Sequence, residues 1–432
     1  MKRSFMLMCL IALCGLLEPM RFALAAEPTA NATSEDARRV FDTVRRRIYQ
    51  VRALTTSGDA VASSGSGFLV GENGLIATNW HVVDDYLLEP EHYRLEVRRH
   101  DNTRVPVHVI AIDSLNDLAL LRIEGEALPP LPLQTEMPAK GGKGFAMGDP
   151  KGVGFTVVEG TFNGLAAQSM AGHLHFSGAI NAGMSGGPTV DATGAVVGVN
   201  VARRTDADLM GFLVPAEHLA ALIARAPKQA RDNVALLEEA RQGVLQGQAR
   251  AAQHFMEGSA VSHHLGKVTL PAVSEEQFRC RGRSIRETEE GYATEGLQCN
   301  NDLSISVGRR HGTGTIGYDY QVVSNLSLDP FRFAKLVSTS LVGDKDDKGD
   351  RKVVGRYVCK TSFLRIPSAT VRATLCVRPY LRFSGLKEAH LRFATVDSSD
   401  TAIVGDLILR GFTDDSIRRV TRRFMEGLEW KR

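Results

Sequence analysis

The chain has 432 residues, 43% of them hydrophobic and 23% charged, and a formal net charge of +3. This composition is ordinary for a globular protein and excludes collagen-like, coiled-coil and wholly disordered chains. A length of this order predicts two or three domains with sizeable cores.

The first segment of the chain has the pattern of a secretory signal peptide. Lys2 and Arg3 precede an apolar run that ends at Leu17 and is too short to span a bilayer. Small residues follow in an A-x-A arrangement that ends at Ala25. We therefore expect residues 1–25 to be removed, and the mature chain to be exported without a transmembrane segment. A buried N-terminal helix is the alternative.

A β-rich region follows. Ser34 is placed to cap a short helix that extends to about Arg47. Short apolar runs then alternate with breaks containing Gly, Asn and Pro, which favours an all-β barrel or sandwich over a βαβ sheet. A helix expected at Ala216–Ala226 closes this region. The expected strands are Gly67–Val70, Leu75–Thr78, Tyr93–Val97, Val105–Ile112, Leu118–Ile123, Gly144–Met147, Phe155–Glu159, Ala195–Val201 and Met210–Val214.

Residues 228–258 are expected to form a helical linker. They lack turn signals, and apolar residues such as Val234 and Leu237 recur at roughly helical spacing, which predicts one or two helices. Gly243 and Gly247 weaken this pattern, because glycine has low helix propensity.

Residues 260–432 are predicted to form a second, β-rich domain of the α+β class. They end in an amphipathic helix that begins near Asp414. Acidic side chains predominate in residues 26–259 and basic ones in residues 260–432, which supports at least two domains. The arginines are dispersed, as is typical of a solvated face, so no nucleic-acid partner is expected.

All cysteines of the mature chain lie in this second domain: Cys280, Cys299, Cys359 and Cys376. An even number of cysteines in an exported chain indicates disulfides, and four cysteines allow three pairings. The local pairs Cys280–Cys299 and Cys359–Cys376 are the simplest choice, each closing a long hairpin. Zinc is the rival explanation, but no pair has the short spacing of zinc ligands. We expect no metal and no cofactor.

One constellation carries chemistry. Ser185 lies in the sequence Asn-Ala-Gly-Met-Ser-Gly-Gly-Pro, flanked by Gly183, Gly186 and Gly187. These glycines predict a tight turn that exposes the hydroxyl and directs backbone N–H groups to one point. Acyl transfer needs both a nucleophile with room to react and preorganised donors for the oxyanion. A glycine-rich hairpin without function is the alternative.

Two further residues, both earlier in the chain, complete a catalytic set. His81 follows an apolar strand in Thr-Asn-Trp-His-Val-Val, and Asp117 begins another in Asp-Leu-Ala-Leu-Leu. An imidazole can take the serine proton, and a buried carboxylate can hold that imidazole in the required tautomer. The order His81, Asp117, Ser185 is the chymotrypsin order and differs from that of the α/β-hydrolases, which argues against a lipase or esterase.

These motifs occur in the order found in trypsin-fold serine proteases, and over about residues 36–226 the chain resembles the bacterial HtrA/Deg type. Three more motifs carry the resemblance: Ser64-Gly-Ser-Gly-Phe-Leu-Val70, Ala146-Met-Gly-Asp-Pro150 and Gly211-Phe-Leu-Val-Pro215. The expected fold is therefore mainly β: a trypsin-like double β-barrel, a helical linker and a second β-rich domain.

The resemblance also implies roles for individual residues. His81 would be the general base, Asp117 its orienting residue and Ser185 the nucleophile, while the N–H groups of Gly183 and Ser185 would form the oxyanion hole. The specificity pocket would be formed by Ala179 at its base and by Val201 and Ala202 on its wall. Because alanine offers no carboxylate to Lys or Arg, a small aliphatic residue is expected before the scissile bond.

The chain also departs from the pattern of the family that it resembles. Met184 stands where trypsin-type zymogens carry Asp and HtrA-type enzymes usually carry Asn, so activation by N-terminal cleavage is not expected and the order of the oxyanion loop is open. Residues 260–432 lack the Gly-Leu-Gly-type loop of a PDZ domain. Peptide-triggered regulation and cage assembly are therefore not carried over.

The sequence thus predicts a serine endopeptidase, periplasmic or secreted in a bacterium. It would hydrolyse peptide bonds of exposed or unfolded envelope polypeptides through an acyl-enzyme intermediate. Polypeptide substrates are the expected partners, and the sequence does not predict the oligomeric state. The alternative is an envelope binding or scaffold protein in which the barrel is vestigial. The intact set of His81, Asp117 and Ser185 favours the enzyme.

Overall fold

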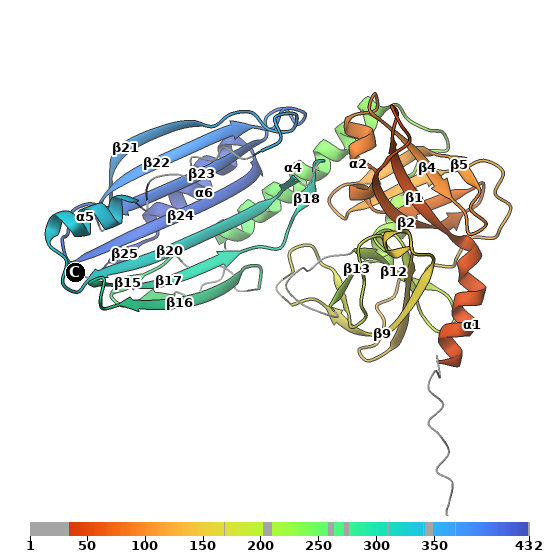
Figure 1. Cartoon of the computed structure of the whole chain (residues 1–432), viewed down its shortest axis with the longest axis horizontal. Helices are drawn as coiled ribbons and strands as arrows, with labels where there is room; N and C mark the ends of the chain where they lie inside the picture. The colour runs from red at the N-terminus through yellow and green to blue at the C-terminus, as the bar shows by residue number, and fades with distance from the viewer. Residues whose placement is uncertain are drawn as a thin grey trace, which may run out of the picture.

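The computed structural model describes residues 34–167, 169–201, 210–257, 263–271, 276–308, 311–339, 341, 349–367 and 369–430. The expected signal peptide and Ala202 lie outside these residues. Figure 1 shows two neighbouring β-rich units and a third, larger sheet, which one long helix joins to them. No helix in the described ranges is long and apolar enough to cross a membrane.

Helix α1 (Glu35–Val44) precedes the first β-unit. It begins where the sequence predicts, because the Oγ atom of Ser34 accepts the N–H of Ala37 at 3.1 Å. Val40 and Val44 are buried on one face of this helix. The 3-10 turn η1 (Arg45–Arg47) leads from it into the first strand.

The first unit is a seven-stranded antiparallel sheet in the order β5-β4-β1-β2-β3-β7-β6. Helix α2 (Trp80–Leu88) begins two residues after the end of β3. The strand expected at Val105–Ile112 is divided into two, and Pro106, which has no N–H to donate, ends the first piece. The strands are β1 (Ile48–Thr55), β2 (Val61–Gly71), β3 (Leu75–Thr78), β4 (Tyr93–Arg98), β5 (Arg104–Pro106), β6 (His108–Asp113) and β7 (Leu118–Arg122).

The second unit is a closed six-stranded barrel in the order β10-β13-β12-β11-β8-β9. The 3-10 turn η2 (Pro150–Gly152) follows its first strand, and helix α3 (Ala216–Arg225) follows its last. Together the two units confirm the expected mainly β, trypsin-like architecture. The strands are β8 (Lys143–Gly148), β9 (Thr156–Leu165), β10 (Leu174–Phe176), β11 (Pro188–Val190), β12 (Val196–Val201) and β13 (Gly211–Pro215).

The linker is a single helix, α4 (Asn233–Glu257). Gly243 and Gly247 lie one turn apart on it, where neighbouring side chains come close to its backbone. A Cβ at Gly243 would collide with Ser114 of the first unit, and one at Gly247 would lie 2.5 Å from Ile305 Cδ1 of the C-terminal part. The two glycines lower helix propensity but permit this close approach.

The C-terminal part is built on a seven-stranded antiparallel sheet in the order β16-β17-β20-β24-β23-β22-β21. Its strands are β16 (Arg279–Glu287), β17 (Tyr292–Asn300), β20 (Thr315–Asn325), β21 (Val358–Ile366), β22 (Ala369–Pro379), β23 (Lys387–Thr395) and β24 (Thr401–Phe412). Short strands accompany it: the pair β18 (Ile305–Ser306) and β19 (Gly312–Thr313), and the sheet of β14 (His264–Leu265), β15 (Val268–Thr269) and β25 (Glu429–Trp430).

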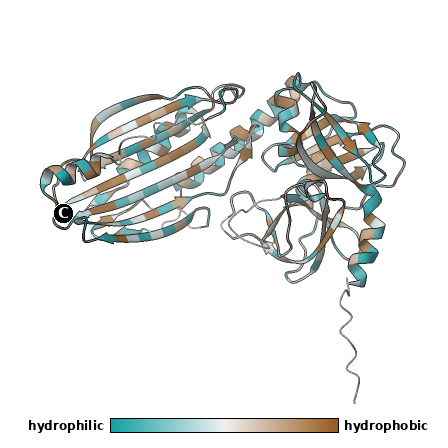
Figure 2. Cartoon of the chain, viewed as in Figure 1, coloured by the Kyte–Doolittle hydropathy of each residue, from teal (hydrophilic) through white to brown (hydrophobic). Residues whose placement is uncertain are grey.

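Helices cover this sheet unequally. Helix α6 (Asp414–Glu426) packs on one face, where the rings of Tyr320 and Phe424 are stacked with their centroids 4.4 Å apart. Helix α4 packs on the same face through Phe255 and Tyr318. Helix α5 (Pro330–Thr339) covers only one end of the other face. The alternating hydropathy along the strands in Figure 2 is the pattern of a sheet with one packed and one more polar face.

Two disulfides hold the edges of this sheet. Cys280 is bonded to Cys299 across β16 and β17, and Cys359 to Cys376 across β21 and β22. These are the two local pairs that the sequence favours. Because β16 and β21 are the two edge strands, each disulfide joins an edge strand to its neighbour.

One continuous apolar core joins the first unit to the C-terminal sheet. Trp80 of the first unit, Phe255 of α4 and Phe393 of the C-terminal sheet belong to the same cluster of buried side chains. The boundary expected near residue 260 divides the sequence, but it does not divide this core.

Candidate active site

His81 and Asp117 are in direct contact. His81 is the second residue of α2, and Asp117 lies in the turn between β6 and β7 with a φ of 54°. The imidazole Nδ1 and the carboxylate Oδ2 are 2.6 Å apart, and the backbone N–H of His81 donates to Oδ1 at 3.0 Å. Two contacts to one carboxylate fix both the ring and the helix start that carries it.

Asn79 holds the aspartate turn in place. Its side-chain Nδ2 donates to the backbone carbonyl of Asp117 at 2.8 Å, and the residue is fully buried. Sequence reasoning assigned no role to Asn79, although it lies in the motif that carries His81. The signal was a polar residue between a buried strand and a helix, at the position that usually caps the helix.

Ser185 lies in a turn between β10 and β11, on the second unit. Gly183 and Gly186 on either side have φ values of 96° and 83°, which favour glycine. A Cβ at Gly186 would also collide with the backbone carbonyl of Ser66. The glycines predicted from sequence are therefore required both by backbone conformation and by close packing.

Strand β2 passes between the histidine helix and the serine turn. A Cβ at Gly65 would lie 2.6 Å from Val82 Cγ2, directly after His81, and 2.9 Å from the carbonyl oxygen of Ser185. Only a residue without a side chain lets β2 approach both elements. The Gly in the Ser64-Gly-Ser-Gly motif thus brings the His81 helix and the Ser185 turn together.

Ser66 on β2 organises the serine turn, a role that sequence reasoning missed. Its Oγ donates to the Gly183 carbonyl at 2.7 Å and accepts the N–H of Asp149 at 2.9 Å. Its backbone N–H donates to the carbonyl of Ser185 at 2.7 Å. Among the described residues, no acceptor is found for the N–H of Gly183. A donor of this kind beside a nucleophile is what an oxyanion hole requires.

Asn200 supports the same turn from β12. This fully buried residue donates from Nδ2 to the carbonyls of Met147 and Met184, at 2.9 and 3.3 Å. Its Oδ1 accepts the hydroxyl of Thr189 at 2.6 Å. An asparagine inside an apolar strand is the sequence signal for this role, because such a buried amide needs partners.

Met184, the residue before Ser185, is fully buried in an apolar cluster with Phe162, Phe176 and Leu213. Dispersion and burial therefore anchor the turn at the position where trypsin-type zymogens carry an aspartate.

The residues expected to form a specificity pocket are only partly described. Ala179 is half-buried between β10 and the Ser185 turn. Val201 is the last residue of β12, buried and paired with Phe212 of β13. Ala202 lies outside the described residues, so this pocket stays a prediction.

Two titratable groups with shifted pKa values lie near the candidate site. Burial raises the pKa of Asp84, one turn after His81 on α2, to about 7. Burial lowers the pKa of His173, which precedes β10, although the charges of Asp302 and Asp117 act in the opposite direction. Within the described ranges, no group of three His, Cys, Asp or Glu side chains is arranged to hold a metal ion.

Comparisons with known proteins find similarity over the region that contains this site. Residues 65–199, which include His81, Asp117 and Ser185, match the family model of the trypsin-like peptidase domain. The putative serine protease HhoA of Synechocystis sp. is 35% identical over 173 residues, 38% of this chain and 42% of that protein. The mitochondrial serine protease HTRA2 of Drosophila pseudoobscura pseudoobscura is 32% identical over 177 residues, 39% of this chain and 40% of that protein.

The chain thus spans about two fifths of the length of these curated relatives. Among solved structures, the serine endoprotease from Yersinia pestis has a TM-score of 0.39 and 24% identity, covering 44% of this chain and 65% of that one.

Proposed function

We propose that this chain, which carries a trypsin-like peptidase domain, is an exported serine endopeptidase that acts through His81, Asp117 and Ser185. The observation that carries the proposal is the 2.6 Å contact between His81 Nδ1 and Asp117 Oδ2, made beside a glycine-framed serine turn. A barrel that had lost catalysis would have no need for this arrangement, so the contact supports the enzyme over a scaffold.

In the proposed mechanism, His81 acts as the general base. Asp117 holds Nδ1 of the ring, which leaves Nε2 to take the proton from Ser185 Oγ as the oxygen attacks a peptide carbonyl. The same imidazole then donates the proton to the leaving amine. Water, activated by His81, hydrolyses the acyl-enzyme and frees Ser185.

The oxyanion of the tetrahedral intermediate would be bound by the N–H groups of Gly183 and Ser185. Three fixed contacts support this assignment: Ser66 holds the Gly183 carbonyl, Asn200 holds the Met184 carbonyl and Met184 is packed in apolar surroundings. Donors that are held in place before the reaction cost no reorganisation when the charge develops.

We infer that the substrates are exposed or unfolded polypeptides of a bacterial envelope. The resemblance to HtrA/Deg proteases supports this class of substrate. The two disulfides support export, because structural disulfides persist in oxidising compartments.

The test is cleavage of fluorescein-labelled casein by the purified mature protein and its variants. Ser185→Ala and His81→Ala are each expected to lower the rate by at least about a thousandfold, since members of a triad act as a unit. Ser57→Ala, in an exposed turn between β1 and β2, is the matched control and should leave the rate unchanged. Undiminished cleavage by Ser185→Ala would refute the proposed function.

A further inference from the structure

The geometry points to a positioning role for one short segment of the C-terminal part. We propose that Asp302 and Ser306 clamp the two β-units of the peptidase domain together, so that the C-terminal sheet belongs to the catalytic unit. This inference rests on the proposed function. Asp302 and Ser306 are positioning residues, because they act through the elements that carry the triad.

The first half of the clamp holds the helix that carries His81. Trp80 Nε1 donates to the backbone carbonyl of Ser306 at 2.8 Å. The hydroxyl of Ser306 donates to Asp84 Oδ2 at 2.6 Å, and the N–H of Gly308 donates to the same oxygen at 3.0 Å. Trp80 and Asp84 flank His81 on α2, so the helix is held on both sides of the imidazole.

The second half of the clamp holds the loop between β9 and β10, on the second unit. Asp302 Oδ1 accepts the N–H of Met170 at 2.7 Å. The Met170 side chain is fully buried and belongs to the core that the C-terminal sheet shares with the first unit. Asn301, itself buried, donates to Met170 Sδ at 3.5 Å.

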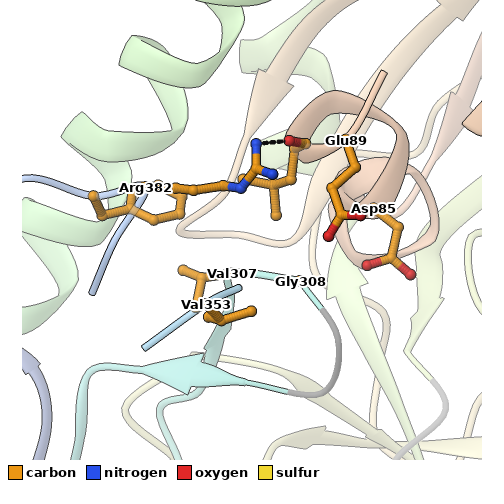
Figure 3. Close-up of a pocket in the computed structure, with 8 residues that line it drawn as sticks. Asp85, Glu89, Val307, Gly308, Val353 and Arg382 are labelled. Atoms are coloured by element: carbon orange, nitrogen blue, oxygen red, sulfur yellow. Dashed lines mark hydrogen bonds between the residues drawn. The ribbon is translucent and has the colours of Figure 1, made fainter. Parts of the chain in front are cut away.

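The end of helix α2 is held by a further set of contacts. Arg382 donates to the carbonyl of Leu88, the last residue of α2, as the dashed line in Figure 3 shows. The Nζ atom of Lys352 lies 3.5 Å from Oε2 of the buried Glu89 carboxylate. The gap beside these residues has a volume of only about 10 Å³, room for at most one water molecule, so the two surfaces are closely packed here.

Because this segment contacts both units, the clamp affects how the catalytic residues are placed relative to one another. His81 and Asp117 come from the first unit, whereas Ser185 comes from the second. Residues 302–306 contact both units within five consecutive positions. A displacement of about 1 Å in a reacting group can cost about a hundredfold in rate. A contact that fixes one unit relative to the other therefore acts on the reaction without touching the substrate.

The test compares the full-length double variant Asp302→Ala/Ser306→Ala with wild type. A fluorophosphonate probe reports the rate of Ser185 labelling at saturating probe and, separately, the probe concentration for half-maximal rate. The expected result is a loss of at least about tenfold in the saturating rate with a half-maximal concentration within about threefold. Ser304→Ala, in the same segment but exposed, is the matched control and should behave as wild type.

The conservative pair Asp302→Asn/Ser306→Thr keeps an acceptor oxygen and a hydroxyl, so it should restore the saturating rate to within about threefold of wild type. Near-ultraviolet circular dichroism identifies any variant that fails to fold. If the alanine pair fails to fold, the conservative pair is compared with wild type in its place. A labelling rate equal to wild type in the folded alanine variant would overturn the clamp alone. A wild-type protein that the probe does not label would overturn the clamp and the proposed function together.

Discussion

The hydroxyl of Ser66 donates a 2.7 Å hydrogen bond to the carbonyl oxygen of Gly183, so that a strand of the first unit fixes the serine turn of the second. The same hydroxyl accepts the N–H of Asp149, and Ser66 is fully buried. Replacing Ser66 by Ala would leave the Gly183 carbonyl and the Asp149 N–H without this hydrogen-bond partner.

Ser66→Ala is therefore expected to reduce stability and activity together. Leaving buried polar groups unpaired costs about 1–3 kcal/mol of unfolding free energy, which urea denaturation measures. The rate of fluorophosphonate labelling should also fall by at least about tenfold, because the Gly183 carbonyl loses the hydrogen bond that holds the serine turn in place. If Ser66→Ala is destabilised but labels as fast as wild type, Ser66 has no part in ordering the proposed oxyanion donors.

Gly186 provides a prediction with a close internal control. Gly186 and Gly141 have the same φ of 83°, so Ala at either position pays the cost of a left-handed backbone, about 1 kcal/mol. At Gly141 a Cβ would meet nothing within 4 Å, whereas at Gly186 it would collide with backbone and side-chain atoms of β2 and β3.

Gly186→Ala should therefore be destabilised by at least about 2 kcal/mol more than Gly141→Ala and lose labelling, while Gly141→Ala keeps it. Thermal unfolding and probe labelling of the two variants provide the comparison. Equal stabilities for the two variants would mean that the turn around Ser185 is not packed against β2 as described.

Asp84 makes stability depend on pH. Its pKa is about 7 in the folded protein against an ordinary value of 3.8, because burial disfavours the charged form. The folded state thus binds the proton more tightly than the unfolded state does. The resulting stabilisation is fully present below about pH 4 and is lost as the pH rises through about 7.

Asp84→Asn removes this titration and keeps an acceptor for Ser306 and Gly308. The difference in unfolding free energy, wild type minus Asp84→Asn, should decline between about pH 4 and pH 7 by at most about 1.4 kcal/mol per pH unit. Urea denaturation at several pH values measures it. A difference that is constant over this range, or that grows with pH, would contradict the burial of an uncharged Asp84 under the C-terminal segment.

The shared core predicts the outcome of truncation. Ending the chain after residue 260 would leave Trp80 of α2 and Phe255 of α4 without the C-terminal side chains that cover them. We expect residues 34–260 to aggregate or to unfold at a much lower temperature than the full chain, as size-exclusion chromatography and thermal melts would report. A soluble, monomeric fragment with full labelling activity would show that the peptidase domain does not need the C-terminal part.

The features that sequence predicted are those that depend on neighbouring residues. Strand β3 has the predicted bounds, Leu75–Thr78, because a short apolar run ends at polar Asn79. The turn around Ser185 can be predicted because it requires glycines at neighbouring positions in the sequence. Of the three possible disulfide pairings, the sequence favours the two local ones, and the strand register that aligns Cys280 with Cys299 agrees with that choice.

The remaining features depend on contacts between distant parts of the chain. Trp80 and Ser306 are 226 residues apart, and no local pattern in either segment indicates the other. Gly243 and Gly247 lower the helix propensity of the linker, but close packing against Ser114 and Ile305 outweighs that cost. Propensity therefore left open one helix or two, because the partners that decide it lie elsewhere in the sequence.

The most direct test of the catalytic assignment is the site of covalent modification by a fluorophosphonate probe. Intact-mass spectrometry of the mature wild-type protein should show one adduct per chain, and peptide mapping should place it on Ser185. The His81→Ala and Ser185→Ala proteins should carry none under the same conditions, because the hydroxyl is not activated in the first and is absent in the second. An adduct on another serine, or an unmodified wild-type protein that is correctly folded, would contradict the assignment of Ser185 as the nucleophile.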